Sequence, residues 1–175
     1  AFTMRNHIRA LREDPTAGLD GVRVALIGDI EHSRVARSNI MCLKKLGADV
    51  TLCGPSTLMP TAIERMGVDV THNLREAIDG ADIIYSLRIQ LERQEDGLFP
   101  SLREYIRLFR VDTAALAHAK PEAIIMHPGP INRDIELSTN VADGPRSVIL
   151  EQVSNGVAIR MAVMHLLVNG KRAKK

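Results

Sequence analysis

Residues 127–130 read His-Pro-Gly-Pro and follow a short apolar stretch at residues 123–126. Proline has no backbone N–H to donate to a sheet, so a strand that enters this motif must stop at His127. The carbonyl oxygens of Pro128 and Gly129 then lack a sheet partner and can accept hydrogen bonds from a bound molecule. The motif therefore predicts a binding edge with two main-chain acceptors, and an ordinary proline-rich turn is the alternative.

Two arginines could hold an anion near such an edge. Arg34 falls in the first turn of an expected helix, where backbone N–H groups and the helix dipole already favour negative charge. Arg88 and Gln90 share one face of an extended segment, and Glu92 could orient the Arg88 guanidinium if a helix starts there. Since a guanidinium holds a carboxylate through two parallel hydrogen bonds, the set suits a small ligand with carboxylates at one end and amino or amide groups at the other. A solvated helix start and a charged loop are the alternatives.

The elements that must position these residues alternate along the chain. Apolar stretches predict strands at residues 22–27, 49–53, 68–71, 81–87 and from 123. Helical patterns occupy residues 1–14, 33–46, 57–66, 74–78, 112–119 and 146–167, the last with a break at 154–156, while residues 88–109 read as a long loop or broken helix. This alternation indicates an α/β fold, a doubly wound, Rossmann-like parallel sheet flanked by helices. Ligands of such sheets bind beyond the carboxyl ends of the strands, where Arg34, Arg88 and His127 should lie.

Composition and charge argue against several classes of partner. The 175 residues are 45% hydrophobic and 25% charged, as in a globular protein, and no apolar run approaches the ~18 residues of a membrane span. The net charge is +2, the basic run at residues 171–175 reads as a solvated tail, and five aromatic residues, two Tyr and three Phe, offer little for stacking nucleic acid bases. Cys42 and Cys53 have neither zinc-site nor disulfide-scaffold spacing. We expect no membrane, nucleic acid or metal, and a reducing, cytoplasmic location.

The segment that follows the first expected strand does not have the pattern of a nucleotide-cofactor site. Residues 28–34 contain one glycine, whereas the dinucleotide fingerprint has three, so a pyrophosphate could not approach this backbone closely. A Walker-type Gly-Lys-Ser and a Gly-x-Ser-x-Gly elbow are also missing from the sequence. The expected cofactor is therefore none.

The start of the chain predicts a connection to something longer. Ala1 is not an initiator methionine, and the helical pattern at residues 1–14 begins without a capping residue or a signal-peptide apolar region. We expect this helix to belong to a larger protein.

Four segments together resemble the catalytic chains of aspartate carbamoyltransferases. In order they are residues 28–38, 87–93, 126–133 and 155–162. The resemblance implies that residues 15–147 form the C-terminal, aspartate-binding domain. It also implies that residues 1–14 and 148–170 are two helices that cross to an N-terminal carbamoyl-phosphate domain missing from this sequence, with residues 171–175 a basic tail.

The resemblance assigns substrate-binding roles to the residues already singled out. Arg34 and Arg88 match the arginines that bind the two carboxylates of aspartate. Gln90 lies beside Arg88 in the substrate site, and Glu92 positions the Arg88 guanidinium. Arg93 resembles a residue of the mobile loop that closes over the substrate.

The turn after the expected central strand matches the catalytic centre of the family. The main-chain carbonyls of Pro128 and Gly129 match the pair that orients the carbamoyl group and the incoming amine. His127 and Pro130 resemble the scaffold of that turn. Arg133 departs from relatives that carry an arginine directly after the second proline, so its role stays open.

The implied reaction transfers the carbamoyl group of carbamoyl phosphate to the amine of L-aspartate, giving N-carbamoyl-L-aspartate and phosphate in pyrimidine biosynthesis. The resemblance implies a homotrimer, with regulatory or dihydroorotase subunits as the further partners that the family offers. It also implies an isolated chain that is inactive without the N-terminal domain. The alternatives are a noncatalytic assembly subunit of the same fold, or a carbamoyltransferase for another amino acid such as ornithine.

Overall fold

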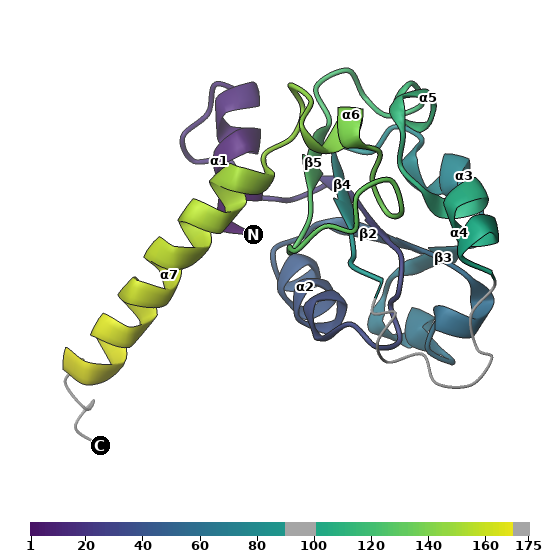
Figure 1. The fold of residues 1–175 in the computed structure, drawn as a ribbon. Coiled ribbons are helices and arrows are strands. Elements are labelled where there is room, and N and C mark those ends of the chain that lie inside the picture. Colours follow the sequence, from purple (N-terminus) through teal and green to yellow (C-terminus); the bar gives the residue numbers. More distant parts are fainter. Residues whose placement is uncertain (90–100, 170–175) are drawn as a thin grey trace.

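Five parallel strands form one sheet in a computed structural model that describes residues 1–89 and 101–169 (Figure 1). The strand order is β3-β2-β1-β4-β5, with β1 (Arg23–Ile27), β2 (Asp49–Cys53), β3 (Asp69–Thr71), β4 (Ile83–Ser86) and β5 (Ile124–Met126). Every neighbouring pair runs parallel. The expected doubly wound parallel sheet of an α/β fold is confirmed.

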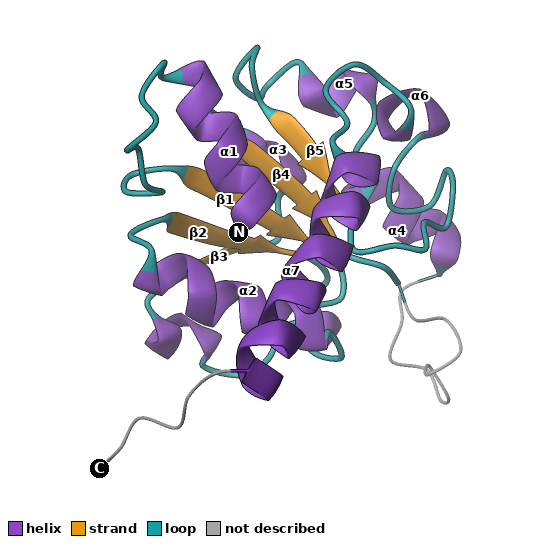
Figure 2. Cartoon of the chain, turned by 90° about the vertical axis from the view of Figure 1, so that its left-hand side faces the viewer, coloured by secondary structure: helices purple, strands orange, loops and turns teal. Residues whose placement is uncertain are grey.

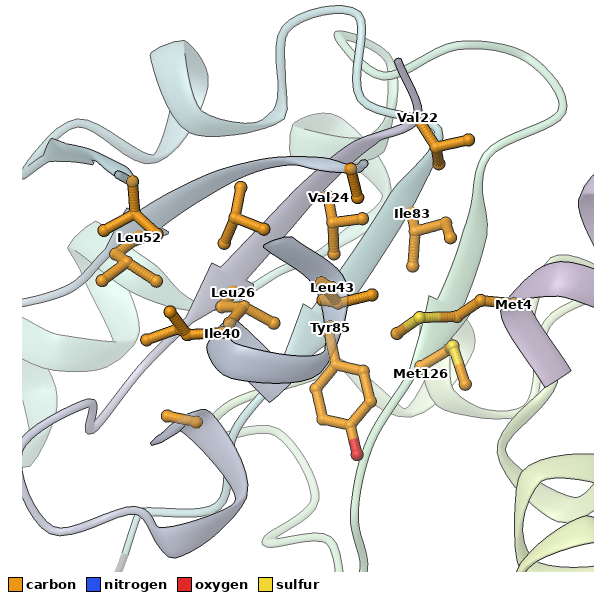
Figure 3. Packing of buried hydrophobic residues seen from close by; sticks show 14 of the residues in the cluster. Met4, Val22, Val24, Leu26, Ile40, Leu43, Leu52, Ile83, Tyr85 and Met126 are labelled. Atoms are coloured by element: carbon orange, nitrogen blue, oxygen red, sulfur yellow. The ribbon is translucent and has the colours of Figure 1, made fainter. Parts of the chain in front are cut away.

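Both faces of the sheet are buried, which explains why its strands read as continuous apolar stretches. Val24 and Leu26 of β1 point to one face, and Ala25 and Ile27 point to the other. Figure 3 shows the first of these two core layers, in which Leu26 packs among side chains of β2, β4 and the helix that follows β1.

Helices cover the two faces separately (Figure 2). Helices α1 (Phe2–Leu11) and α2 (Arg34–Lys45) lie on one face, where Met4, Ile40 and Leu43 join the core. The other face carries α3 (Leu74–Ile78), α4 (Leu102–Phe109), α5 (Thr113–Leu116) and α6 (Thr139–Ala142).

Capping side chains fix where two of these helices begin. The Ser33 hydroxyl accepts the Ala36 N–H at 3.1 Å and starts α2, as the helical pattern predicts. The Asp112 carboxylate accepts the Ala115 N–H at 2.9 Å and starts α5. Helix α5 ends at Leu116, before the expected end at Ala119, because the chain continues in tighter turns with bonds such as Ala119 N–H to Leu116 O.

Two further predicted helices differ from the structure. Residues 57–66 do not form one helix but two short 3₁₀ turns, η1 (Ser56–Leu58) and η2 (Ile63–Met66), because Pro60 cannot continue a helix. The long C-terminal helix α7 (Ile149–Asn169) runs without the predicted break at residues 154–156. Its polar residues there are satisfied in place: Ser154 Oγ donates to Leu150 O, and Asn155 Nδ2 donates to Thr3 Oγ1 of α1 at 3.0 Å.

Helix α7 projects beside α1 and away from the sheet (Figure 1). Its apolar side chains are largely exposed, with Leu150 83% and Val168 81% accessible to solvent. Across residues 1–89 and 101–169, we find no helix with the length and apolar character needed to cross a membrane. The exposed apolar side chains of α7 include Leu150, Val153, Met161 and Leu167.

A close backbone approach joins β1 to the residues after β4. Gly28 has a φ of 127°, and a Cβ added there would lie 3.0 Å from Leu87 O and 3.3 Å from the Tyr105 hydroxyl. The Leu87 N–H also donates to Ile27 O at 2.7 Å. Only glycine combines this φ with this spacing, so Gly28 allows the chain after β4 to lie against β1.

Substitution of two glycines tests this packing. Gly28→Ala should lower the free energy of unfolding by about 1–3 kcal/mol, because it adds a strained φ and a clash with Leu87. Gly156→Ala in α7 is the control, since a Cβ there meets nothing within 4 Å; it should leave stability unchanged or raise it by about 0.5–1 kcal/mol. Urea unfolding of both variants measures the difference, and equal effects would contradict the close approach at Gly28.

Candidate functional site

The candidate site lies at the carboxyl edge of three neighbouring strands. Strand β4 pairs with β1 on one side and with β5 on the other, so the segments that follow all three strands leave the sheet at one edge (Figure 2). Arg34 follows β1, Arg88 follows β4, and His127 directly follows β5. Sheet topology thus brings these three predicted residues to the same edge.

Arg34 is the first residue of α2, as predicted. Its side chain is exposed and makes no hydrogen bond or ion pair with any residue of the described ranges. Asp29, which precedes Arg34 in the segment after β1, is buried and accepts the His32 N–H at 3.0 Å. Asp29 Oδ1 also lies 3.0 Å from His32 Nδ1. A buried carboxylate therefore fixes the loop that presents Arg34.

The His-Pro-Gly-Pro motif forms a tight turn directly after β5. The Gly129 N–H donates to His127 Nδ1 at 2.9 Å, Gly129 has a φ of 65°, and the Gly129–Pro130 peptide bond is cis. Pro128 and Gly129 are half-buried, whereas Pro130 is exposed. Within residues 1–89 and 101–169, no N–H or O–H donates to the carbonyl oxygen of Pro128 or Gly129. The described part of the chain thus leaves both predicted acceptors available.

His127 is completely buried and neutral at physiological pH. Burial, and after it the positive charge of Arg88, lower the pKa of its imidazole to about 4. Because Nδ1 accepts the Gly129 N–H, we assign the ring proton to Nε2. A neutral imidazole therefore supports the turn that carries Pro128 and Gly129.

A buried polar cluster beneath the turn is a feature that our sequence reasoning missed. Glu136 Oε1 accepts the Ile89 N–H at 2.9 Å and an Asn132 Nδ2 hydrogen at 2.8 Å, and lies 4.0 Å from His127 Nε2. Burial raises the pKa of the Glu136 carboxyl. The one sequence signal was an acidic residue between two apolar ones, Ile135 and Leu137.

Arg133 faces away from this cluster. Its guanidinium makes a bidentate ion pair with Asp143, at 2.6 and 3.1 Å, and both side chains are more than half exposed. Solvent screens a surface pair of this kind, so it contributes little to stability. The predicted residues Gln90, Glu92 and Arg93 lie outside the described residues, so the structure does not place them.

A cavity of about 470 Å³ lies on the α1 side of the sheet. Phe2 of α1 and Gly156 of α7 line it, together with Tyr85 at the end of β4 and Met126 at the end of β5. The Tyr85 hydroxyl accepts a hydrogen from Gln152 Nε2 at 3.0 Å. The cavity therefore connects the carboxyl edge of the sheet with the junction of the two helices.

The fold is that of an α/β domain, and the carboxyl edge of its sheet carries two arginines and two main-chain acceptors as a candidate ligand site. Residues 20–167 match a family model described as the Asp/Orn binding domain of aspartate/ornithine carbamoyltransferase. The chain therefore belongs to the aspartate/ornithine carbamoyltransferase family.

Curated relatives carry the name aspartate carbamoyltransferase catalytic subunit. The protein of Gemmatimonas aurantiaca is 56% identical over 158 residues, which cover 90% of this chain and 50% of the relative. The protein of Ruminiclostridium cellulolyticum is 58% identical over 149 residues, 85% of this chain and 48% of the relative. The chain spans about half the length of the curated relatives it matches.

Solved structures of ornithine carbamoyltransferases share the fold. The enzyme from Pyrococcus furiosus superposes with a TM-score of 0.78 at 28% identity, over 95% of this chain and 54% of that one. The enzyme from Giardia lamblia superposes with a TM-score of 0.79 at 21% identity, over 97% and 58%. These likenesses support the architecture of the domain.

The buried, neutral His127 predicts a dependence of stability on acid. Its pKa is about 4 in the folded chain and 6.5 in an unfolded one, so the stabilisation is fully present above pH 6.5 and is lost as the pH falls toward 4. At about 1.4 kcal/mol for each pKa unit, the loss reaches roughly 3 kcal/mol. His127→Asn, which keeps an acceptor for Gly129, should therefore lose less stability than the unmodified chain between about pH 7.5 and about pH 4.5.

Urea unfolding at both pH values checks this prediction. The carboxylates titrate alike in both proteins. The difference between the two proteins in the stability lost on acidification therefore isolates the contribution of His127. Equal acid sensitivity of the two proteins would show that His127 is already protonated, or already exposed, in the folded state.

Proposed function

We propose that the chain is the amino-acid-binding half of an aspartate carbamoyltransferase. The observation that carries the proposal is the pairing of β4 with β5, which brings Arg88 and the His127 turn to the same edge of the sheet, because they follow these two strands. The buried Glu136 carboxylate lies between the two segments: its Oε1 accepts the Ile89 N–H at 2.9 Å and lies 4.0 Å from His127 Nε2. Membership of the carbamoyltransferase family supports the same reading.

The ligand chemistry fits aspartate in each of its parts. Its two carboxylates suit the guanidinium groups of Arg34 and Arg88, each of which can form two parallel hydrogen bonds. Its amine and the NH₂ group of a carbamoyl donor suit the main-chain oxygens of Pro128 and Gly129. Ornithine offers one carboxylate and a second amine, so a second arginine would have no partner on it.

The proposed reaction needs orientation more than proton transfer within this half. The aspartate nitrogen forms a bond to the carbonyl carbon of carbamoyl phosphate, the bond from that carbon to the phosphate oxygen breaks, and the amine loses a proton as phosphate leaves. Holding both reactants in line can supply about 7–11 kcal/mol of the barrier. His127 takes no proton in this scheme: it is neutral and supports the turn through Gly129.

The other half of the site must come from outside the chain. We expect the groups that bind the phosphate to lie on an N-terminal carbamoyl-phosphate domain. The curated relatives are about twice as long as this chain, so their length accommodates such a domain. Helices α1 and α7 are the proposed connection to it, because α7 exposes apolar side chains along its length. The cavity between these helices continues to the sheet edge, so a domain seated there would border the aspartate site. A homotrimer of such catalytic chains is part of this proposal.

Activity of a completed protein tests the proposal. The chain alone should show no carbamoyltransferase turnover, because the phosphate-binding groups are missing from it. Fused behind the N-terminal half of the Gemmatimonas aurantiaca relative, it should form N-carbamoyl-aspartate from carbamoyl phosphate and aspartate. A fused protein that is folded but inactive would favour a noncatalytic assembly subunit, and a preference for ornithine would favour the other alternative.

Arg88→Ala in that fused protein should weaken aspartate more than carbamoyl phosphate. Charge-assisted hydrogen bonds contribute about 1.5–3 kcal/mol, so we expect the kcat/KM for aspartate to fall roughly a hundredfold. Arg75→Ala, on the exposed surface of α3, is the matched control and should change neither parameter. Steady-state kinetics with each substrate varied separately gives the answer. Loss confined to carbamoyl phosphate would place Arg88 at the other substrate.

A further inference from the structure

Glu136 is a buried acid for which the proposed reaction has no direct use. Its side chain is 0% exposed, and it lies in the segment that follows the His-Pro-Gly-Pro turn. Burying a carboxylate costs several kcal/mol unless hydrogen bonds compensate it, so a fold keeps one where its bonds hold something in place.

One oxygen of Glu136 binds the residue that follows Arg88. Glu136 Oε1 accepts the Ile89 N–H at 2.9 Å, and Asn132 Nδ2 donates both to this oxygen, at 2.8 Å, and to Ile89 O, at 3.1 Å. Both backbone polar groups of Ile89 are thus held by side chains of residues 132–136. Strand β5 ends at Met126, so these side chains continue the pairing of the β4 segment where no strand is left.

The same oxygen faces the turn that carries the main-chain acceptors. It lies 4.0 Å from His127 Nε2, the nitrogen to which we assign the ring proton. The opposite ring nitrogen accepts the Gly129 N–H at 2.9 Å. Glu136 therefore binds Ile89 directly and faces, without a hydrogen bond, the imidazole whose other nitrogen holds Gly129.

We propose that Glu136 is a positioning residue that sets the Arg88 guanidinium at a fixed place relative to the Pro128 and Gly129 carbonyl oxygens. It acts through hydrogen-bond geometry at Oε1 and not through its charge. The substrate side of this inference rests on the proposed function, since it assumes that Arg88 binds an aspartate carboxylate. The structural side, the joining of Ile89 and Gly129, is independent of it.

Two substitutions separate geometry from charge. Glu136→Gln keeps an acceptor oxygen for Ile89 and Asn132 but carries no charge. Glu136→Ala removes the acceptor oxygen and the charge. In the fused enzyme, Glu136→Ala should lower kcat/KM for aspartate about a hundredfold, as expected for a misplacement of about 1 Å, and should raise KM for aspartate far more than KM for carbamoyl phosphate. Glu136→Gln should stay within about threefold of the unmodified enzyme on both substrates.

Asp143→Asn is the matched control, because it removes an acid from the same stretch of chain but from its exposed surface. It should leave both KM values unchanged. An Ala variant as active as this control would overturn the proposal, and a Gln variant as impaired as the Ala variant would show that charge and not geometry is required. If Glu136→Ala does not fold, Asn132→Ala removes one arm of the same cluster and should raise KM for aspartate about tenfold.

Hydrogen exchange on the chain itself provides a readout that does not depend on activity. The Ile89 and Gly129 amides should exchange at least about tenfold faster in Glu136→Ala than in Asp143→Asn, while the Ile84 amide in the middle of β4 stays protected in both. Unchanged exchange at Ile89 and Gly129 would overturn the joining role. An inactive fused enzyme with the expected exchange pattern would reject the proposed function and leave the positioning role supported.

Discussion

Parallel pairing of β4 with both β1 and β5 is the constraint on which the rest of the structure depends. Backbone hydrogen bonds fix the three strands in register and direct their carboxyl ends to one edge. The bond from Leu87 N–H to Ile27 O continues this pairing past the end of β4, and Gly28 leaves room for it. The side chain of Arg88 is therefore attached to a backbone that hydrogen bonds hold in place.

The turn after β5, in contrast, has a backbone that cannot form the hydrogen bonds of a strand. Two prolines remove the N–H groups that a further strand would need, and Gly129 takes a positive φ that other residues adopt only with strain. No donor within residues 1–89 and 101–169 binds the carbonyl oxygens of Pro128 and Gly129, while the buried His127 ring accepts the Gly129 N–H. His127 contributes a neutral ring, because burial and the Arg88 charge both oppose its protonation. A rigid, uncharged support of this kind suits a site that orients its reactants.

Much of this fold could be predicted from local sequence patterns. Apolar stretches located all five strands, and Ser33 and Asp112 marked two helix starts by their capping chemistry. The single helix at 57–66 was wrong because the apolar spacing outweighed Pro60 in our reading. The predicted break in α7 was wrong because the polar side chains at its centre find partners within the helix and on α1.

The site was predictable where its chemistry is local and not where it depends on distant contacts. Arginine at a helix start and prolines after a strand are visible in the sequence, so the positions of Arg34, Pro128 and Gly129 in the fold could be predicted, while their roles stay predictions. Glu136 was missed because its importance comes from burial against Ile89, a residue 47 positions away, and an acid in a loop usually lies in solvent. The roles of Gln90, Glu92 and Arg93 stay predictions.

A crystal structure of the fused enzyme with carbamoyl phosphate and succinate, an unreactive four-carbon dicarboxylate, tests the central claim most directly. We expect one succinate carboxylate to pair with Arg88 and the other to pair with Arg34. The carbonyl oxygens of Pro128 and Gly129 should point at the carbamoyl group. A dicarboxylate bound away from this edge, or arginines that point to opposite faces of the sheet, would contradict it.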